Sequence, residues 1–484
     1  MSLFVGLDVG TQGTKGVLLD AEAGEVVARA AHAYDLLPGL PPGAAEQHPD
    51  TWLEACADVL GQLLAGVDPS RLAGLAVSGQ QHGLVVLDEA DRVVRPAKLW
   101  CDTSTAEEAR ELAERLGQAV PTGFTASKIV WMARHEPQAW ARVRRVLLPH
   151  DYLNFVLTGR AVMEAGDASG TGFFDVEGRT FDREEVAAVD PALADRLPPL
   201  MEAGTAVGTV SESAARRFGL PAGLLVASGG GDNMMSAFGS GATRPGVVVL
   251  SMGTSGTVFA QSERPVVDPE GLIAPFCDST GAWLPLLCVM NLTGVTEEVR
   301  AVFPEHDLET LTGLAAEAPP GCDGLLLLPY LQGERVPDLP QASGSLLGLR
   351  PGLLRAGTLF RAAMEGTSLN LARGVDRLRD LGTTVSSVRL VGGGAANPLW
   401  RGILADCLGV PVQRVVEGES GALGAALCAL WTSRREQGED VTAHEVAEPF
   451  IALHDEVVEP DAARQAIYIE AKERMGQLTE RLHG

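Results

Sequence analysis

The chain has 484 residues, of which 46% are hydrophobic and 21% are charged. An ordinary domain has about 150 residues, so this length predicts at least two cores and excludes a small binding module. With 38 Lys and Arg residues against 63 Asp and Glu residues, the formal charge is −25, which disfavours nucleic acid and membrane surfaces as partners. No apolar run approaches the roughly 18 residues that a membrane span requires.

The seven cysteines include no CxxC pair, so they fit neither a disulfide framework nor a zinc cluster. The nine histidines show no HExxH motif and no clustered spacing, which gives a built-in transition-metal site little support. The first residues lack the basic segment and the small-residue cleavage site of a secretory signal. We therefore expect a reducing compartment, the cytoplasm.

The first predicted element is a β-hairpin over residues 4–19, with its turn at residues 10–14. An alternation of helix and strand follows, which is typical of an α/β fold. The first half is expected to contain a helix at 52–64, strands at 72–78 and 84–87, helices at 105–116 and 128–136, and a strand at 143–148. The second half is expected to contain buried strands at 325–328 and 388–391 and a long helix at 359–378.

A second copy of the hairpin sequence lies about half a chain away. Residues 248–257 align with residues 5–14 at a constant offset of 243, and six of the ten aligned positions are identical. A match of ten residues can arise by chance, but a repeat at half the length favours two domains of similar plan. A glycine-rich seam at 239–246 would separate them, so the predicted domains are 1–243 and 244–484.

Three glycine-rich segments are candidates for holding phosphate or nucleotide. In the first, Gly10 to Lys15, small residues let backbone N–H groups converge on an anion, while threonine hydroxyls and Lys15 add donors. The second is its copy, Gly253 to Gly256, and the third, Gly392 to Pro398, joins a strand to a helix. Neither the Walker A pattern nor GxGxxG occurs, so the nucleotide site must be of another kind.

Asp8 stands in an otherwise apolar strand directly before the first turn, where Val or Ile would be usual. It either holds a hydrated Mg²⁺ against phosphates or simply caps the turn through a side-chain hydrogen bond. The adjacent phosphate-like turn favours the metal.

Asp232 follows a predicted strand at 224–228 and the triple glycine 229–231, and it precedes an apolar, helix-like stretch at 234–238. This places it like a helix N-cap. It serves either only as that cap or also as a general base, because a helix N-terminus favours the ionised carboxylate and the glycines leave room for a substrate hydroxyl. Three glycines exceed what a cap needs.

The polar run Gln80-Gln81-His82 interrupts an apolar stretch at 75–87. Such side chains suit a buried strand only if they face a polar ligand, for which a polyhydroxylated molecule fits well. The alternative is an exposed β-turn. Trp100 and Asp102 offer an aromatic wall and a hydrogen-bond acceptor, which also suit a sugar.

Taken in order, these motifs resemble those of the FGGY carbohydrate kinases, and within that family most closely those of the bacterial xylulose kinases. The resemblance runs nearly end to end, through GLDVGT at 6–11, GFTASK at 123–128, LPHDYL at 148–153, GGGDN at 229–233, LPYLQGER at 328–335, GSLLGL at 344–349 and GGGA at 392–395. It implies an α/β fold of two actin-like (ribonuclease-H-like) domains with a cleft between them. ATP would bind mainly to the second domain and the sugar mainly to the first.

The resemblance also implies roles for individual residues. Asp232 would be the general base, and Asp8 would serve the Mg²⁺. The residues implied at the ATP are Gly10, Thr11, Gly253, Thr254, Gly394 and Asn397. The residues implied at the ketose are Gln81, His82, Trp100, Asp102, Asp232 and Asn233.

Three positions depart from the family pattern. Gln81 stands where xylulose kinases usually carry Met, so an amide replaces a thioether facing the sugar, and this puts the exact sugar in doubt. Ser104 stands where many relatives carry Arg, and Thr358 stands where the second signature commonly has a polar ring or carboxyl residue. Neither of these two changes touches the expected base.

The expected reaction transfers the γ-phosphoryl group of MgATP to the primary C5 hydroxyl of a ketopentose, D-xylulose before others. One alternative is an FGGY kinase for ribulose, glycerol or another sugar or polyol. A farther alternative is a non-kinase actin-like ATPase, which would hydrolyse nucleotide without sugar. The sequence leaves a homodimer open.

Overall fold

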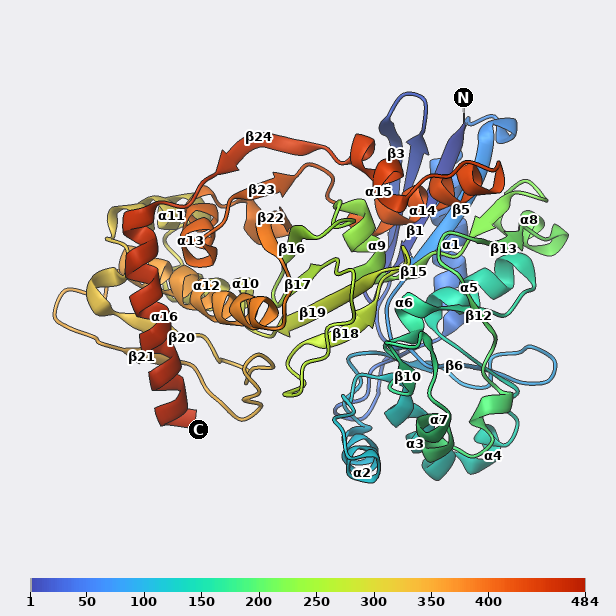
Figure 1. Cartoon of the computed structure of the whole chain (residues 1–484), viewed down its shortest axis with the longest axis horizontal. Helices are drawn as coiled ribbons and strands as arrows, with labels where there is room; N and C mark the ends of the chain where they lie inside the picture. The colour runs from blue at the N-terminus through green and yellow to red at the C-terminus, as the bar shows by residue number, and fades with distance from the viewer. Residues whose placement is uncertain (1, 484) are drawn as a thin grey trace.

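Two seven-stranded mixed sheets, one in each half of the chain, form the framework of the computed structural model, which describes residues 2–483 (Figure 1). The first sheet has the strand order β13 (Ala206–Thr209), β14 (Leu225–Ala227), β5 (Leu72–Gly79), β1 (Leu3–Val9), β2 (Gly13–Asp20) and β3 (Glu25–Ala33), with β15 (Gly230–Gly231) also paired to β5. The second sheet has the order β24 (Leu453–Val458), β23 (Val412–Val415), β22 (Val385–Val391), β16 (Gly246–Met252), β17 (Gly256–Ala260), β19 (Trp283–Val289) and β18 (Ala274–Cys277).

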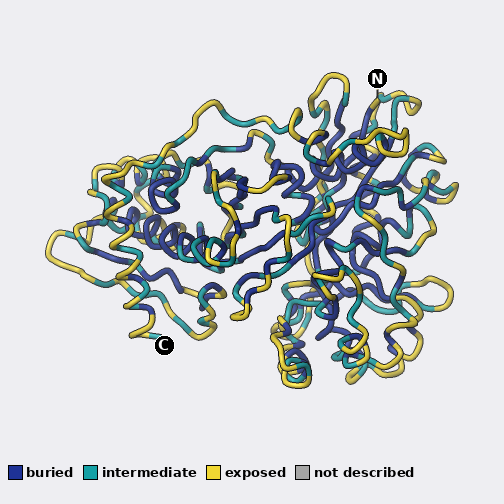
Figure 2. The backbone as a smooth tube through the Cα atoms, viewed as in Figure 1, coloured by how far each residue is buried: buried dark blue, intermediate teal, exposed yellow. Residues whose placement is uncertain are grey.

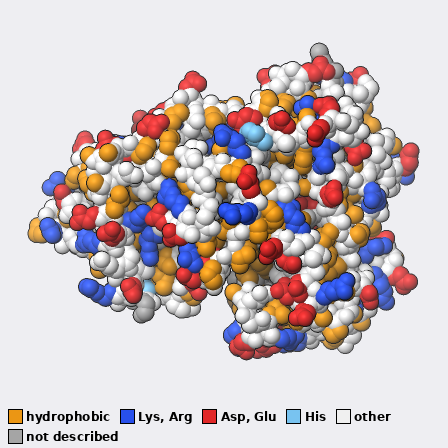
Figure 3. Space-filling model, in the orientation of Figure 1, with side chains coloured by type: hydrophobic (Ala, Val, Ile, Leu, Met, Phe, Trp, Pro, Cys, Tyr) orange, Lys and Arg blue, Asp and Glu red, His pale blue; other side chains and the backbone are white. Residues whose placement is uncertain are grey.

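The two sheets share one plan. In the first, β1 pairs antiparallel with β2 and parallel with β5; in the second, β16 pairs antiparallel with β17 and parallel with β22. The outer strands repeat the pattern, because β14 and β23 join the parallel side while β3 and β19 extend the antiparallel side. The expected α/β fold of two actin-like domains is confirmed, and the space-filling surface is indented between the two halves (Figure 3).

The two hairpin turns differ by one residue. Val9 pairs with Thr14 across the first turn, whereas Met252 pairs with Gly256 across the second. The offset of 243 residues between equivalent positions therefore holds from β1 to β16 and at the start of each turn. In the strands after the turns, structurally equivalent positions are offset by 242 residues instead.

Helices cover both sheets. Those of the first half are α1 (Pro49–Leu63), α2 (Ala106–Leu116), α3 (Thr125–His135), α4 (Pro137–Trp140), α5 (Pro149–Thr158), α6 (Ala165–Ala168), α7 (Arg183–Val189), α8 (Glu212–Phe218) and α9 (Asp232–Gly239). Those of the second half are α10 (Thr293–Val302), α11 (Leu308–Glu317), α12 (Ala356–Asp380), α13 (Pro398–Leu408), α14 (Ser420–Glu436), α15 (Ala443–Ala447) and α16 (Ala462–His483). Short strands outside the two sheets are β4 (Glu46–Gln47), β6 (Val85–Leu87), β7 (Ala97–Lys98), β8 (Arg145–Leu147), β9 (Met163–Glu164), β10 (Phe174–Asp175), β11 (Thr180–Phe181), β12 (Leu200–Met201), β20 (Leu326–Leu328) and β21 (Ser345–Leu347).

Every element expected from the sequence exists, with ends displaced by up to three residues. The helix expected at 52–64 is α1, which begins at Pro49 because the His48 side chain caps it by accepting a hydrogen bond from the Asp50 N–H. The strand expected at 143–148 is shorter, since only β8 pairs, with β6. Within residues 2–483, no helix is long and apolar enough to cross a membrane.

The central strands are buried on both faces, as the dark segments of Figure 2 show. For the first sheet, α1 packs against β2 and β3, and α14 packs against β1, β5 and β2. Cover on two faces explains why β1 is almost continuously apolar rather than alternating.

Helix α14 belongs to the second half by sequence but packs on the sheet of the first half. It also crosses α9 at very short range: a Cβ atom built on Gly424 would lie 1.8 Å from the Met235 carbonyl oxygen, and one on Gly239 would lie 1.9 Å from that of Ser420. Only glycine permits such a backbone approach. One apolar core therefore includes residues of both sheets together with α9 and α14.

The predicted domain limits, 1–243 and 244–484, stay a prediction, because packing does not follow the chain order at α14. The segments after residue 442 separate in space. Helix α15 packs on α14, whereas α16 packs against α12 and α13 of the second half, at the far left of Figure 1.

Candidate active site

The turn after β1 has two backbone N–H groups that are free to bind an anion, those of Thr11 and Gln12. The Gly10 N–H donates to the Gly13 oxygen at 3.0 Å, and the Tyr34 hydroxyl donates to the Gly10 oxygen at 2.8 Å. These bonds fix the turn, while the N–H groups of Thr11 and Gln12 make no hydrogen bond within residues 2–483. Successive free N–H groups of this kind form an anion-binding concavity.

The turn after β16 is built in the same way. The Gly253 N–H donates to the Ser255 oxygen at 3.1 Å, and the Gly253 and Thr254 oxygens accept the N–H groups of Thr293 and Leu292, both at 3.1 Å. Among the described residues, the N–H groups of Thr254 and Ser255 have no acceptor. Both turns that the sequence singled out thus have the geometry that phosphate contact needs, and their role as phosphate contacts stays a prediction.

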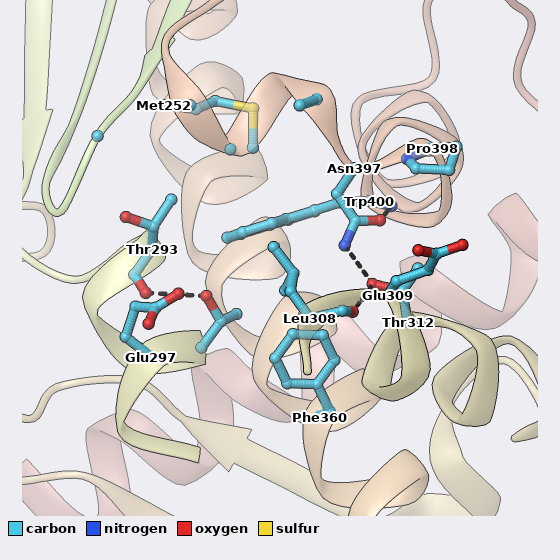
Figure 4. A pocket seen from close by; sticks show the side chains of 15 residues that line it. Met252, Thr293, Glu297, Leu308, Glu309, Thr312, Phe360, Asn397, Pro398 and Trp400 are labelled. Atoms are coloured by element: carbon cyan, nitrogen blue, oxygen red, sulfur yellow. Dashed lines mark hydrogen bonds between the residues drawn. The ribbon is translucent and has the colours of Figure 1, made fainter. Parts of the chain in front are cut away.

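A cavity of about 710 Å³ opens beside the second turn and is lined by residues of β16, α10, α11, α12 and α13. Figure 4 shows the aromatic rings of Trp400 and Phe360 inside it, with Asn397 linked to Thr312. The Asn397 amide caps α13 by accepting the Trp400 N–H at 3.2 Å and donates to the Thr312 hydroxyl at 2.9 Å. The size suits a nucleoside.

The glycines of the third segment shape this cavity. Gly393 and Gly394 line it together with Gly253, so a nucleoside bound here would direct its phosphates to the second turn. A Cβ atom on Gly394 would lie 2.8 Å from the Thr293 side chain, so a larger residue would press on the Thr293 side of the cavity.

Asp8 is partly buried at the end of β1 and accepts the Ser78 hydroxyl at 2.6 Å through Oδ1. Its other carboxylate oxygen has no partner within residues 2–483. Burial raises the pKa of Asp8 to about 6, although Ser78 and Lys15 act in the opposite direction. Lys15, expected as a phosphate donor, pairs with Glu419 at 2.8 Å. Its contact with phosphate stays a prediction, and the ammonium would then have to bind both Glu419 and the phosphate.

Asp232 is the first residue of α9, and its N-cap is Gly231. The N-cap position expected for Asp232 is therefore wrong by one residue, since the strand β15 continues through Gly231 and leaves the aspartate inside the first turn. Its Oδ1 accepts the N–H and the Nδ2 of Asn233 at 2.8 and 3.1 Å, while Oδ2 has no partner among the described residues. Burial raises the pKa of Asp232 to about 8, and the carboxylates of Asp8 and Asp167 add to the effect.

Gln81 is packed beside the triple glycine. It is 3% exposed, and its Oε1 accepts the Asn233 Nδ2 at 2.8 Å. A Cβ atom on Gly231 would lie 2.7 Å from the Gln81 Cγ, so the glycine is what allows the amide to approach. The buried Gln81 Nε2 makes no well-formed hydrogen bond within residues 2–483, although the amide is close enough to the Asp167 carboxylate to lower the pKa of that group; a ligand or water that accepts from it would remove the cost of a weakly paired donor. The turn considered for this segment exists at residues 81 and 82, but it is not exposed, since Gln81 is buried and His82 half-buried.

His82, the next residue in the chain, has a left-handed backbone conformation with φ 63°. Its ring packs against both Phe124 and Phe276, with centroid distances of 4.6 and 5.7 Å, and those two rings also contact each other. Burial, helped by the charges of Lys128 and Arg335, lowers the pKa of His82 to about 3. The ring is therefore neutral; its buried Nδ1 makes no well-formed hydrogen bond within residues 2–483, although the ring lies against the Gly170 backbone.

Trp100 connects the sugar candidates to the first phosphate turn. Its ring is 39% exposed, and its Nε1 donates to the Thr11 Oγ1 at 2.9 Å. Asp102, in contrast, is fully buried and accepts from Ala45, Lys98 and Ser104. Its direct contact with a sugar stays a prediction and requires one of these donors to give way.

The second domain supplies residues that the sequence reasoning missed. The β18–β19 hairpin touches the first domain, where the Cys277 N–H donates to the Ser169 hydroxyl at 3.1 Å and the Trp283 Nε1 donates to the Val176 oxygen at 3.0 Å. This contact places the Phe276 ring against His82 and the buried Ser279 hydroxyl, which has no partner in the described chain, beside Gly230. No local pattern links residue 276 to residue 82, so only the fold reveals the contact.

The carboxylates fit a magnesium ion held together with a nucleotide. Asp8 and Asp232 interact electrostatically, and each keeps one oxygen free of chain partners within residues 2–483. No group of three or more metal-binding side chains exists among the described residues. Mg²⁺ in phosphoryl-transfer sites commonly uses one or two carboxylates plus water and phosphate oxygens, so this sparse set is adequate.

Comparison with known proteins agrees with the geometry. The model of the N-terminal domain of the FGGY family of carbohydrate kinases matches residues 3–239, and that of the C-terminal domain matches residues 248–433. Xylulose kinase from Haemophilus influenzae is 40% identical over 449 residues, covering 89% of this chain and 91% of that protein.

Two further relatives extend the comparison. Xylulose kinase from Streptomyces coelicolor is 41% identical over 440 residues, covering 88% of this chain and 86% of that protein. A crystal structure from Brucella ovis, named a xyloylose kinase, superposes with a TM-score of 0.91 at 33% identity and covers 99% of both chains. With matching domains on both sides of a shared cleft and relatives along almost its whole length, the chain belongs to the FGGY family of carbohydrate kinases.

Proposed function

We propose that this carbohydrate kinase transfers the γ-phosphoryl group of ATP to the C5 hydroxyl of D-xylulose, giving D-xylulose 5-phosphate and ADP, with Asp232 as the general base. The observation that carries the proposal is the free Oδ2 of Asp232: Asn233, which holds the other carboxylate oxygen, also donates to Gln81, and the Asp8 carboxylate acts electrostatically on Asp232. The relatives named xylulose kinase, at 40% and 41% identity, support the choice of sugar.

Positioning is the main task of the chain in this reaction, because phosphoryl transfer passes through a loose transition state. The nucleoside would occupy the cavity at Trp400 and Phe360, and the N–H groups of the two turns would hold phosphate oxygens. A magnesium ion, held by Asp8 with phosphate oxygens and water, would neutralise part of the polyphosphate charge.

The proton of the C5 hydroxyl would pass to the Oδ2 of Asp232. A base works best when its pKa lies near the operating pH, and the pKa of Asp232 is raised to about 8. Asn233 holds the other oxygen, Oδ1, so the free oxygen keeps a fixed direction.

The ketose would be held by groups whose buried polar atoms make no well-formed hydrogen bond within residues 2–483. The Gln81 Nε2 can donate, and the neutral His82 ring can donate or accept depending on its tautomer. Hydroxyl groups of a sugar would satisfy both and remove the cost of leaving them unpaired.

Replacement of the base tests the mechanism. We expect Asp232→Asn to lower kcat by roughly 10²- to 10⁴-fold, the usual effect of losing a general base, while ATP binding measured by calorimetry stays within a few-fold. Asp440→Asn, at an exposed aspartate outside the cleft, is the control. Turnover close to wild type in the Asp232 variant would overturn the assignment.

A substrate panel tests the sugar. ADP release is measured with D-xylulose, ribulose, glycerol and gluconate in the presence of Mg²⁺ and again with excess chelator. Release that depends on another sugar would keep the kinase and replace the substrate. Release that needs no sugar would favour an actin-like ATPase. The cytoplasmic location and the homodimer remain predictions.

A further inference from the structure

Arg335 is exposed in a segment whose neighbours are buried. Glu334, before it, is 2% exposed and accepts the N–H groups of Met290 and Arg335 at 2.6 and 2.8 Å. Its second oxygen accepts the Asn291 amide at 3.1 Å. The backbone that carries Arg335 is therefore fixed, while the guanidinium is left in the open.

The same anchor holds the second phosphate turn. Met290 and Asn291 lead directly into Leu292 and Thr293, whose N–H groups bind the oxygens of that turn. Glu334 thus ties the position of Arg335 to the position of Gly253 and Thr254 through one short segment.

The Arg335 guanidinium lies beside β19 and within electrostatic reach of one sugar candidate, His82. Burial raises the pKa of the Cys288 thiol on β19, and the adjacent Arg335 guanidinium opposes this. Cys288 pairs with Thr257, which follows the second turn directly. The charge of Arg335 also reaches His82 of the first domain, whose ring contacts Phe276 of the same hairpin as Cys288.

Arg335 is a cation at this place that forms no ion pair within residues 2–483; its described partner is the Cys288 thiol, which leaves donors of the guanidinium over. Lys15 is paired with Glu419, and the buried Lys128 ammonium donates to the Gly123 and Phe124 oxygens. No carboxylate lies within 4.0 Å of the Arg335 guanidinium in residues 2–483, although the chain carries 63 acidic residues. An anchored guanidinium without a counter-charge is suited to a ligand oxygen.

We propose that Arg335 donates hydrogen bonds to the oxygens of the phosphoryl group as that group passes from ATP to the sugar. Its backbone is tied to the second phosphate turn through Glu334, its charge reaches His82 of the first domain, and it comes from the opposite domain to Asp232. No covalent bond is made to it; the guanidinium stabilises the charge on the transferring group. This inference rests on the proposed function.

The test compares Arg335→Gln and Arg335→Lys with wild type, after D-xylulose-dependent ADP release by wild type has been established; without that release, the proposed function fails before this inference is reached. Loss of one such donor typically lowers kcat by roughly 10²- to 10³-fold. We expect that loss for Arg335→Gln, partial recovery for Arg335→Lys, and an unchanged dissociation constant for D-xylulose.

Product binding separates the phosphoryl role from a sugar role. We expect D-xylulose 5-phosphate to bind Arg335→Gln at least ten-fold more weakly than wild type. Arg350→Gln, at another exposed arginine, after β21, should match wild type throughout, and all variants should keep the wild-type Tm. A kcat within two-fold of wild type for Arg335→Gln, or weaker binding of D-xylulose itself, would overturn the inference.

Discussion

Four ionisable side chains are buried together behind the triple glycine. His150 lies between Asp167 and Asp151, at 2.6 and 3.1 Å, and all three are at most 1% exposed. Burial by itself lowers the pKa of His150, but the two carboxylates outweigh it and raise that pKa to about 9. Glu164 completes the group, and burial raises its pKa to about 7. Since Asp167 acts on Asp232, this cluster is part of the electrostatic environment of the expected base.

Stability should respond to pH through Glu164. Its folded pKa of about 7 lies above the ordinary value of 4.5, so the stabilisation is complete below pH 4.5 and is lost as the pH rises through 7. At about 1.4 kcal/mol per pKa unit, the loss is on the order of 3 kcal/mol. In Glu164→Gln this loss is absent, and its Tm should approach that of wild type as the pH rises from 5.5 to 8.

Thermal unfolding at both pH values measures the effect. Glu473→Gln, at an exposed residue of α16, should show the same difference from wild type at each pH. A constant gap between Glu164→Gln and wild type would contradict the buried, protonated state of Glu164.

At the scale of single residues, the sequence identified what lies next to a distinctive motif. Asp8, Gln81 and Asp232 were found because a polar side chain in an apolar stretch stands out, and the structure places them in one region. Phe276 and Ser279 were missed, because an aromatic residue in an ordinary strand and a serine in the turn after it carry no local signal. Their contact with the first domain depends on a long-range packing arrangement.

Helices α9 and α14 cross where two glycines face opposing backbones. A side chain on Gly424 would collide with the Met235 carbonyl, which cannot rotate away. We expect Gly424→Ala to lower the free energy of unfolding by about 1–3 kcal/mol or more, the range for overpacked cores. Urea denaturation followed by circular dichroism measures this change.

Gly402 in α13 is the matched control, because a Cβ atom there meets nothing within 4 Å. Gly402→Ala should raise the free energy of unfolding by roughly 0.5–1 kcal/mol, since alanine suits a helix interior better than glycine. Equal effects of the two substitutions would refute the close crossing.

Element types were predictable from periodicity and turn residues, and element ends were less so. Helix α3 begins at Thr125, three residues before the expected position. Its N-cap residue makes no side-chain capping hydrogen bond, so the sequence contains no capping signal that marks this start. The sequence also did not reveal that the two hairpin turns differ by one residue. The two segments align without a gap, and only the pairing of the strands shows the difference.

The two halves of the whole chain share a core through α14. A fragment of residues 1–243 would lack this helix and expose the apolar faces of β1 and β5. We expect the fragment to show no cooperative thermal transition, and co-expression with residues 244–484 to restore one. A cooperative transition in the isolated fragment would show that the first half folds alone.

The contact between Phe276 and His82 has a consequence for changing what the enzyme accepts. One wall of the region that would receive the ketose is carried by the half of the molecule that would grip the nucleotide. Libraries meant to widen the range of substrates should therefore randomise residues 276–279 together with residues 81 and 82. Moving only one of the two domains into another kinase would transfer only part of the sugar-binding wall.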